Sequence, residues 1–253
     1  MSKTIFITGA SSGFGKAIAE KFAASGWNCI ITGRRADRLN DLSAQLRSRY
    51  DIKVLPLVFD VQDREAVTEA IGNIPADWRQ IDVLVNNAGL ALGRDSFEKA
   101  SLNDWDTMIN TNVKGLMYVS KAVLPYLVDQ QKGHIINIGS TAAKEVYKEG
   151  NAYCASKHAV DAISKAMRID LLPHHIKVTA IHPGAAETEF SMVRFKGDQQ
   201  KAEQVYEGYK ALQAEDIADI IFYAANLPEH VCINDLVVTC LAQANSYYTH
   251  KEA

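Results

Sequence analysis

The chain has 253 residues, a length that fits one domain able to bury about three quarters of its unfolded surface. Its formal net charge is −3, and no concentrated basic face of the kind that binds nucleic acid is apparent. It shows no signal peptide and no apolar run long enough to span a membrane, so we expect a cytoplasmic protein without a membrane or nucleic-acid partner.

Strand-like apolar runs alternate with helical patterns along the whole chain. Strands are expected at residues 4–8, 28–32, 54–59, 83–86, 134–138, 177–181 and 236–239. Helices are expected at residues 16–25, 36–49, 63–73, 102–128, 151–172 and 214–226. This alternation predicts a single α/β domain, residues 1–253, with a doubly wound parallel sheet and helices on both of its faces.

The first strand leads directly into a glycine-rich turn and then into a helix. Gly9, Gly13 and Gly15 follow the strand with the spacing Gly-x-x-x-Gly-x-Gly. Glycines let the backbone approach a pyrophosphate closely, and a helix N-terminus offers it free N–H groups and a positive dipole. The order of strand, turn and helix therefore predicts a dinucleotide site and a sheet of the Rossmann type.

Small or polar residues stand just after five of the expected strands, at Gly9, Asp60, Asn87, Ser140 and Pro183. The carboxyl ends of parallel strands meet at one edge of the sheet, and ligands of doubly wound sheets bind outside that edge. We therefore expect these residues to converge on a single site.

The pattern Tyr-x-x-x-Lys occurs three times, at 153/157, 206/210 and 247/251. Only Tyr153 and Lys157 follow an apolar strand and open a long helical pattern, where residues four apart share one face. A lysine cation favours the phenolate and makes tyrosine a usable general acid and base. With the Ser140 hydroxyl to hold an oxygen, this trio predicts interconversion of an alcohol and a carbonyl, with a hydride passed to or from a cofactor.

The chain resembles the short-chain dehydrogenase/reductase family over nearly its whole length. The resemblance rests on the turn 8–15, the run Asn-Asn-Ala-Gly at 86–89, and Pro-Gly at 183–184. Four positions match the family's catalytic tetrad: Asn112, Ser140, Tyr153 and Lys157. The resemblance implies that Tyr153 exchanges the proton, and that Lys157 lowers the pKa of this tyrosine and binds the nicotinamide ribose. It also implies that Ser140 orients the substrate oxygen and Asn112 anchors a water.

Cofactor choice is expected to be made at the end of the second strand, where Arg34 and Arg35 stand without an acidic residue. Guanidinium groups match phosphate geometry, whereas a carboxylate would repel a 2′-phosphate. We therefore expect NADPH/NADP, and the resemblance places Asp60 on the adenine ring. The residues expected to bind the cofactor are Gly9, Ser11, Ser12, Gly13, Phe14, Gly15, Arg34, Arg35, Asp60, Val61, Asn87, Ala88, Gly89, Tyr153, Lys157, Pro183, Gly184 and Thr188.

The resemblance implies that a weakly periodic segment, about 185–210, forms a lid over the substrate. Its run TEFS-x-VRFKGD is similar to that of the 3-hydroxy acid dehydrogenases, also described as malonic semialdehyde or serine dehydrogenases, and of their sulfoacetaldehyde reductase relatives. These substrates share a small carbonyl or alcohol with an anion at the far end, which Arg194 is expected to receive. The expected substrate-binding residues are Ser140, Tyr147, Tyr153, Arg194 and Gln243.

A carboxylate and a sulfonate both fit this set. A planar carboxylate is satisfied by one bidentate guanidinium, whereas a pyramidal sulfonate profits from donors in several directions. Lys144 and Lys148 add positive charge that helps either anion. We favour NADPH-dependent reduction of sulfoacetaldehyde to isethionate, and a 3-hydroxy acid dehydrogenase acting on malonic semialdehyde or serine remains the open alternative.

Two further classes fit less well. Non-catalytic nucleotide-binding regulators of this fold typically lose the tyrosine, the lysine or the glycine motif, and all three are present here. An apolar pocket for a lipid or steroid is disfavoured by Arg194. The four cysteines lack metal or redox spacing, so we expect free thiols and no metal site. By resemblance, the helices at 102–128 and 151–172 pair across a two-fold axis, which implies a homodimer or homotetramer.

Overall fold

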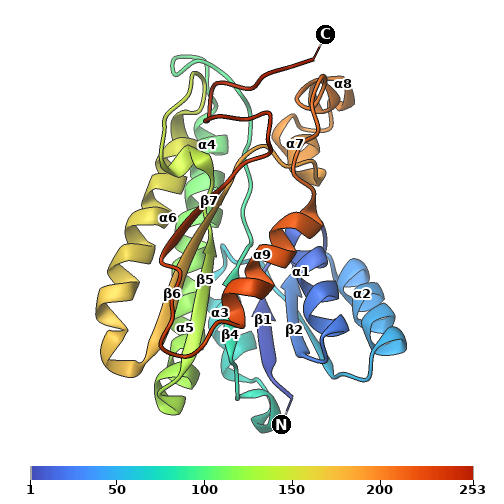
Figure 1. Ribbon diagram of the computed structural model, residues 1–253, viewed down its shortest axis with the longest axis vertical. Helices are drawn as coiled ribbons and strands as arrows, with labels where there is room; N and C mark the ends of the chain where they lie inside the picture. The colour runs from blue at the N-terminus through green and yellow to red at the C-terminus, as the bar shows by residue number, and fades with distance from the viewer. Residues whose placement is uncertain (1, 253) are drawn as a thin grey trace.

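A computed structural model describes residues 2–252 of the chain. Seven parallel strands form one sheet in the order β3-β2-β1-β4-β5-β6-β7, and helices cover both of its faces (Figure 1). The chain winds outwards from β1 to one edge and then from β4 to the other, which is the doubly wound, Rossmann-type sheet that the sequence predicts.

The strands are β1 (Thr4–Ile7), β2 (Asn28–Gly33), β3 (Val54–Val58), β4 (Val83–Asn86), β5 (Gly133–Ile138), β6 (Ile176–Pro183) and β7 (Asp235–Val238). The α-helices are α1 (Gly13–Ala24), α2 (Ala36–Arg49), α3 (Arg64–Gly72), α4 (Leu102–Ile109), α5 (Leu116–Gln130), α6 (Asn151–Asp170), α7 (Glu189–Arg194), α8 (Gln199–Gln204) and α9 (Ala214–Ala225). Short 3-10 helices lie at η1 (Ala76–Trp78), η3 (Thr141–Ala143) and η4 (Leu172–His174), and η2 (Asn110–Gly115) is a π-helical turn.

Successive residues of a central strand enter different cores. Ile5 and Ile7 of β1 join the core that includes residues of α1, α2 and α9, whereas Phe6 between them joins the core that includes residues of α3 and α5. This alternation is the two-residue period of a strand, and a sheet with helices on both faces requires apolar residues on both sides. The near-continuous apolar runs of the sequence therefore correspond to strands that are buried on both faces.

The expected single helix at 102–128 is interrupted. The π-helical turn η2 separates α4 from α5, and Asn112 in this turn is only 2% exposed. Its side chain accepts a hydrogen bond from the Leu90 backbone N–H and donates one to the Leu90 carbonyl oxygen, each at 2.8 Å. A bond to a distant loop leaves no mark in helical periodicity, which explains why the prediction missed the turn.

The loops that follow the strands gather at the upper edge of the sheet in Figure 1, where α7, α8 and the C-terminal segment also lie. The four cysteines are free thiols, as expected. None of the helices within residues 2–252 combines the length and the apolar character that crossing a bilayer would require.

Candidate active site

A cavity of about 960 Å³ opens at the carboxyl ends of the strands. It is lined by all of the predicted site residues except Gly15 and Asn112. Both exceptions lie directly behind the lining, since a Cβ on Gly15 would collide with the Gly9 carbonyl oxygen and Asn112 holds the backbone of Leu90. Residues spread over the chain from 9 to 243 therefore meet at one place.

The glycine-rich turn has a backbone suited to glycine. Gly9 and Gly13 have φ angles of 67° and 51°, in the left-handed region that side chains disfavour. The Asn87 side chain donates to the carbonyl oxygens of Thr8 and Gly9, at 2.8 and 3.2 Å, and so ties the turn to the end of β4. Ser12 begins α1 without a side-chain hydrogen bond to it, which leaves the first N–H groups of the helix available to an anion.

Arg35 lies between the glycine-rich turn and α7. Its guanidinium donates to the hydroxyls of Ser11 and Ser12, at 2.9 and 2.8 Å, and pairs with the Glu189 carboxylate at 3.2 Å. Arg38, which the sequence analysis did not single out, binds the same carboxylate at 2.8 Å. Its position three residues after Arg35 in the first turn of α2 is the signal that could have revealed it, because such residues share one helix face.

Arg34 lies on the other side of the end of β2. Its guanidinium is 3.4 Å from the Asp60 carboxylate, and 60% of its side chain is exposed. The other Asp60 oxygen accepts from the Gln62 N–H at 3.0 Å, so this carboxylate is held in place at the end of β3. Arg34 and Arg35 thus both line the cavity at the end of β2, each paired with a carboxylate.

Three of the four catalytic residues predicted from the sequence, Ser140, Tyr153 and Lys157, line the same cavity. Tyr153 and Lys157 occupy successive turns of α6, and the lysine Nζ lies 6.0 Å from the centre of the tyrosine ring. Nζ donates to the Ile138 carbonyl oxygen at 2.9 Å, which fixes it under the end of β5. Ser140 lies two residues after the end of β5 and is the N-cap of η3, where its Oγ accepts a hydrogen bond from the Ala142 N–H at 3.1 Å.

Burial shifts the pKa values of both groups. It raises the pKa of the Tyr153 phenol, and Tyr147 acts in the same direction, while the Ser140 hydroxyl and Arg194 oppose the shift. Burial lowers the pKa of Lys157 to about 8. The resemblance implies a lowered pKa for the tyrosine. The direction in the structure is the opposite, because desolvation outweighs the groups that stabilise the phenolate.

Arg194, at the end of α7, stands over the predicted catalytic tyrosine. Its guanidinium carbon lies 5.6 Å from the ring centres of both Tyr147 and Tyr153, and its Nη2 donates to the Tyr147 hydroxyl at 3.0 Å. The Gly93 N–H donates to the Arg194 carbonyl oxygen at 2.9 Å, which joins α7 to the opposite rim. A cation is therefore held a short distance from the expected proton donor.

Gln243 lines the cavity but has both ends of its amide engaged by the backbone. Its Oε1 accepts from the Ala185 N–H at 2.7 Å, and its Nε2 donates to the Asn245 carbonyl oxygen at 3.0 Å. A Cβ on Gly184 would collide with the same amide. These contacts show how Gln243 positions the segment after β6, and its expected contact with the substrate stays a prediction.

The other two Tyr-x-x-x-Lys matches lack the arrangement of Tyr153 and Lys157. Tyr206 and Tyr247 both lie outside the helices, so their lysines do not follow on the same helical face. The Tyr206 hydroxyl bonds to the Ser191 hydroxyl and to the Ala186 carbonyl oxygen, at 2.6 and 2.8 Å. Tyr206 therefore ties α7 to the chain around it.

Comparison with known proteins decides the family. The short chain dehydrogenase family is matched over residues 3–199. The chain belongs to this family. It is 48% identical over 241 residues to the NADP-dependent 3-hydroxy acid dehydrogenase YdfG of Salmonella typhi, covering 95% of this chain and 96% of that protein. It is 45% identical over 249 residues to sulfoacetaldehyde reductase 2 of Chromohalobacter salexigens, covering 98% of each.

Among solved structures, the closed form of serine dehydrogenase complexed with NADP+ matches this short-chain dehydrogenase with a TM-score of 0.91. The two sequences are 44% identical, and the match covers 99% of this chain and 100% of the serine dehydrogenase chain. The family and its relatives make the protein an NADP-dependent oxidoreductase, as the sequence predicts.

The residues present fit this cofactor. The free N–H groups at the start of α1 and the close-approach backbone at Gly9 and Gly13 suit a pyrophosphate. The arginines at the end of β2 suit a 2′-phosphate, because guanidinium groups bind phosphate oxygens in pairs. Lys157 would reach the nicotinamide ribose from beneath β5.

Proposed function

We propose that this protein uses NADPH to reduce a short aldehyde that carries a terminal anion, reversibly, to its alcohol. Sulfoacetaldehyde, reduced to isethionate, is the favoured substrate. The position of Arg194 carries the proposal: its guanidinium is half-buried and faces the cavity between Tyr147 and Tyr153. A small aldehyde with its oxygen at Tyr153 would have its far end at this cation.

The chemistry follows from the side chains around the aldehyde oxygen. The Ser140 hydroxyl would hold that oxygen, and Tyr153 would donate its phenolic proton to it. A raised pKa keeps the phenol protonated at neutral pH, which suits the reducing direction. Lys157, protonated below about pH 8, favours the phenolate left behind. Bound NADPH supplies the hydride.

Tyr147 supports a sulfonate as the anion. Its hydroxyl accepts from Arg194, so its own proton stays available for a second oxygen of the substrate. A pyramidal sulfonate uses donors from two directions better than a planar carboxylate does. The 3-hydroxy acid dehydrogenase remains the alternative, with malonic semialdehyde or serine as substrate, because a single guanidinium satisfies a carboxylate and the relative at 48% identity carries that name.

We also propose that residues 185–210 form the lid over the substrate, since α7 in this segment carries Arg194 and contacts the opposite rim at Gly93. A homodimer or homotetramer working in the cytoplasm is proposed as well. Exposed apolar side chains on the two helices expected to pair, Met117 on α5 and Ile169 on α6, support this assembly.

The test is a panel of aldehydes assayed with NADPH against Arg194→Ala. Losing one partner of a desolvated ion pair costs on the order of 2–5 kcal/mol, so kcat/KM for sulfoacetaldehyde and malonic semialdehyde should fall more than tenfold. Propanal, which has no anion, should be scarcely affected. Arg94→Ala is the matched control, because Arg94 lines the same cavity and pairs with Glu149 at its rim. Equal losses for charged and uncharged aldehydes would rule out an anion anchor at Arg194.

Tyr147→Phe separates the two anions in the same panel. It removes the second donor and leaves the guanidinium, so the sulfonate should lose more of its kcat/KM than the carboxylate. Equal losses would favour the 3-hydroxy acid alternative.

A further inference from the structure

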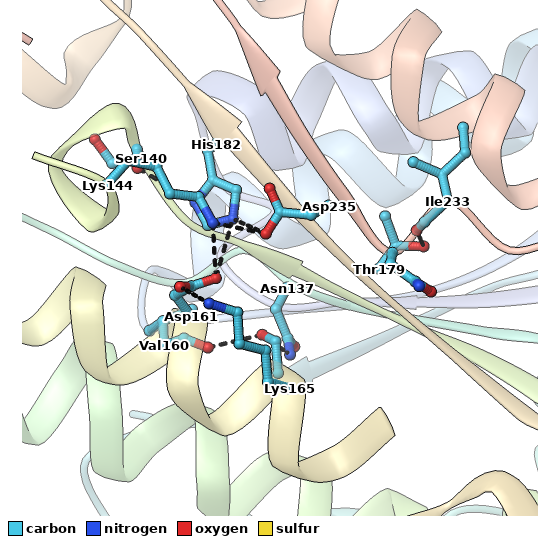
Figure 2. A network of polar contacts seen from close by, with 12 residues as sticks. Asn137, Ser140, Lys144, Val160, Asp161, Lys165, Thr179, His182, Ile233 and Asp235 are labelled. Atoms are coloured by element: carbon cyan, nitrogen blue, oxygen red, sulfur yellow. Dashed lines mark hydrogen bonds and ion pairs between the residues drawn. The ribbon is translucent and has the colours of Figure 1, made fainter. Parts of the chain in front are cut away.

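His182 in β6 lies directly behind the loop that carries Ser140. Its ring is fully buried, and a Cβ on Gly139 would collide with it. The ring Nδ1 lies 3.3 Å from the Ser140 carbonyl oxygen, and Figure 2 shows the imidazole between that loop and a cluster of charged side chains. The position of this ring therefore limits where the backbone of Ser140 can lie.

The other ring nitrogen of His182 faces negative charge. Nε2 is 3.4 Å from the Asp235 carboxylate and 3.6 Å from the Asp161 carboxylate. It has no hydrogen-bond partner among residues 2–252. A fully buried nitrogen in this situation is rare in folded proteins and calls for a physical reason.

The charges around the ring come from three elements. Lys144 follows η3, Asp161 and Lys165 lie on α6, and Asp235 begins β7. Lys144 binds both carboxylates, at 2.9 and 2.6 Å, and Lys165 binds the other oxygen of Asp161 at 2.7 Å. Two lysines and two aspartates balance, so the cluster is neutral when the imidazole is neutral.

A neutral imidazole has one N–H, and its place is fixed by the neighbours. The Ser140 carbonyl oxygen can only accept, so a favourable contact requires the proton on Nδ1 of His182. Burial lowers the pKa of His182, and Lys144 acts in the same direction, against Asp235 and Asp161. Although desolvation opposes it, hydrogen bonds to the two aspartates raise the pKa of Lys144, which keeps this side chain charged.

We propose that His182 is a positioning residue for the catalytic Ser140. Its Nδ1–H donates to the Ser140 carbonyl oxygen and holds the serine hydroxyl beside Tyr153, while burial and the Lys144 ammonium, which occupies the two carboxylates, keep the ring neutral. Protonation of the ring makes Nε2 a hydrogen-bond donor. The ring is then attracted to the carboxylates of Asp161 and Asp235, where it competes with Lys144, and this disturbs the loop that carries Ser140. The inference rests on the proposed reduction, in which Ser140 holds the substrate oxygen, and it does not depend on which aldehyde is the substrate.

The same cluster has the donor set of a metal site. Ligand atoms of Asp161, His182 and Asp235 lie within 4.8 Å of one another. The Lys144 ammonium, bonded to both carboxylates, already fills the place of a cation there. Binding of a metal ion that needs His182 would therefore contradict the proposal.

Substitutions of His182 separate positioning from packing. The Asn amide reaches the place of Nδ1, the Gln amide reaches the place of Nε2, and Leu has no donor. A misplaced reacting group can cost up to about 10²-fold in rate, so His182→Leu and His182→Gln should lower kcat at least tenfold, with NADPH affinity kept. His182→Asn should restore most of the activity. An Asn variant as poor as the Leu variant, or a Leu variant as active as the wild type, would overturn the proposal.

Lys144 is partly exposed, so its variants can test the proposal even if the substitutions of the buried His182 prevent folding. Lys144→Met should raise the pKa of His182, because two carboxylates lose their counter-ion. The acid limb of kcat should then move to higher pH, and activity lost near pH 6 should return near pH 8. Asp235→Asn should move the limb the other way. Lys165→Met is the matched control, because it binds only the outer oxygen of Asp161. If the acid limb of kcat stayed at the same pH in Lys144→Met and Asp235→Asn, the proposal would be contradicted.

Two measurements on the wild-type protein complete the design. Nuclear magnetic resonance of ¹⁵N-labelled histidine should show the proton of His182 on Nδ1, and a proton on Nε2 would contradict the inference. Titration calorimetry with Zn²⁺ should give the same result for the wild-type protein and for His182→Asn, with no binding that depends on His182. Stoichiometric binding lost in that variant would make the cluster a metal site instead.

Discussion

Tyr153 and Lys157 show how a pair found by sequence spacing acquires its chemistry from burial. The spacing of four residues on a helix brings the phenol and the ammonium to one face, and the structure places them there. Burial disfavours the charged form of each group, so the phenol keeps its proton more firmly and the lysine loses its proton more readily. The motif predicts the partners, but the direction of the shift for Tyr153 depends on the surrounding packing.

At the residue scale we expect Tyr153→Phe to abolish turnover and leave NADPH binding intact. A general acid typically contributes about 10²–10⁴-fold to the rate, and the ring without its hydroxyl still fills the same space. Turnover and cofactor affinity are measured separately, the latter by fluorescence. Tyr223→Phe, an exposed tyrosine on α9, is the control. If Tyr153→Phe kept a tenth of the activity, another group would have to donate the proton.

At the scale of elements, the sequence predicts regular strands and helices well and misses the places where side chains bind across the fold. The π-helical turn at Asn112 arises from its bonds to Leu90, twenty-two residues away. The helices α7 and α8 are six residues each, too short to build a clear period. Their arrangement rests on contacts such as the pair of Glu189 with Arg35 and Arg38, which spacing along the chain does not predict.

The Glu189 contact leads to a prediction about α7. Its carboxylate pairs with Arg35, which is expected to receive the 2′-phosphate, and with the neighbouring Arg38, so the two anions compete. Exposed ion pairs are worth about 0.2–1 kcal/mol, and Glu189→Gln should therefore strengthen NADPH binding by up to about fivefold at low salt. NADH lacks the phosphate and should bind as before. Weaker NADPH binding in the variant would mean that Glu189 holds the arginines in place for the phosphate.

At the scale of the whole molecule, the sheet and its site follow from the alternation of strands and helices. Each strand that the sequence predicts is present, with ends that differ by at most two residues, and the motifs after the strands meet in one cavity. Contacts that close this cavity come from residues far apart in sequence, such as Gln243 with Ala185 and Arg194 with Gly93. The sequence does not predict these pairings, because nothing in the local pattern around either residue indicates its partner.

Because the cofactor would contact loops from most of the strands, its binding should stabilise the fold as a unit. A ligand at about 100 times its Kd adds about 2.7 kcal/mol to the free energy of unfolding, which is roughly 5–10 °C in Tm for a domain of this size. NADP+ should give this shift in differential scanning fluorimetry, and NAD+ at the same concentration should give much less.

The double variant Arg34→Ala/Arg35→Ala tests the cause of that difference. Loss of charge-assisted contacts to the phosphate should weaken NADP+ at least tenfold. Because the stabilisation grows with the logarithm of ligand concentration over Kd, the shift should then fall to about half or less at the same NADP+ concentration. The small shift with NAD+ should stay as it was, which also shows that the variant is folded. An unchanged NADP+ shift would mean that the 2′-phosphate is held elsewhere, with Arg38 the next residue to replace.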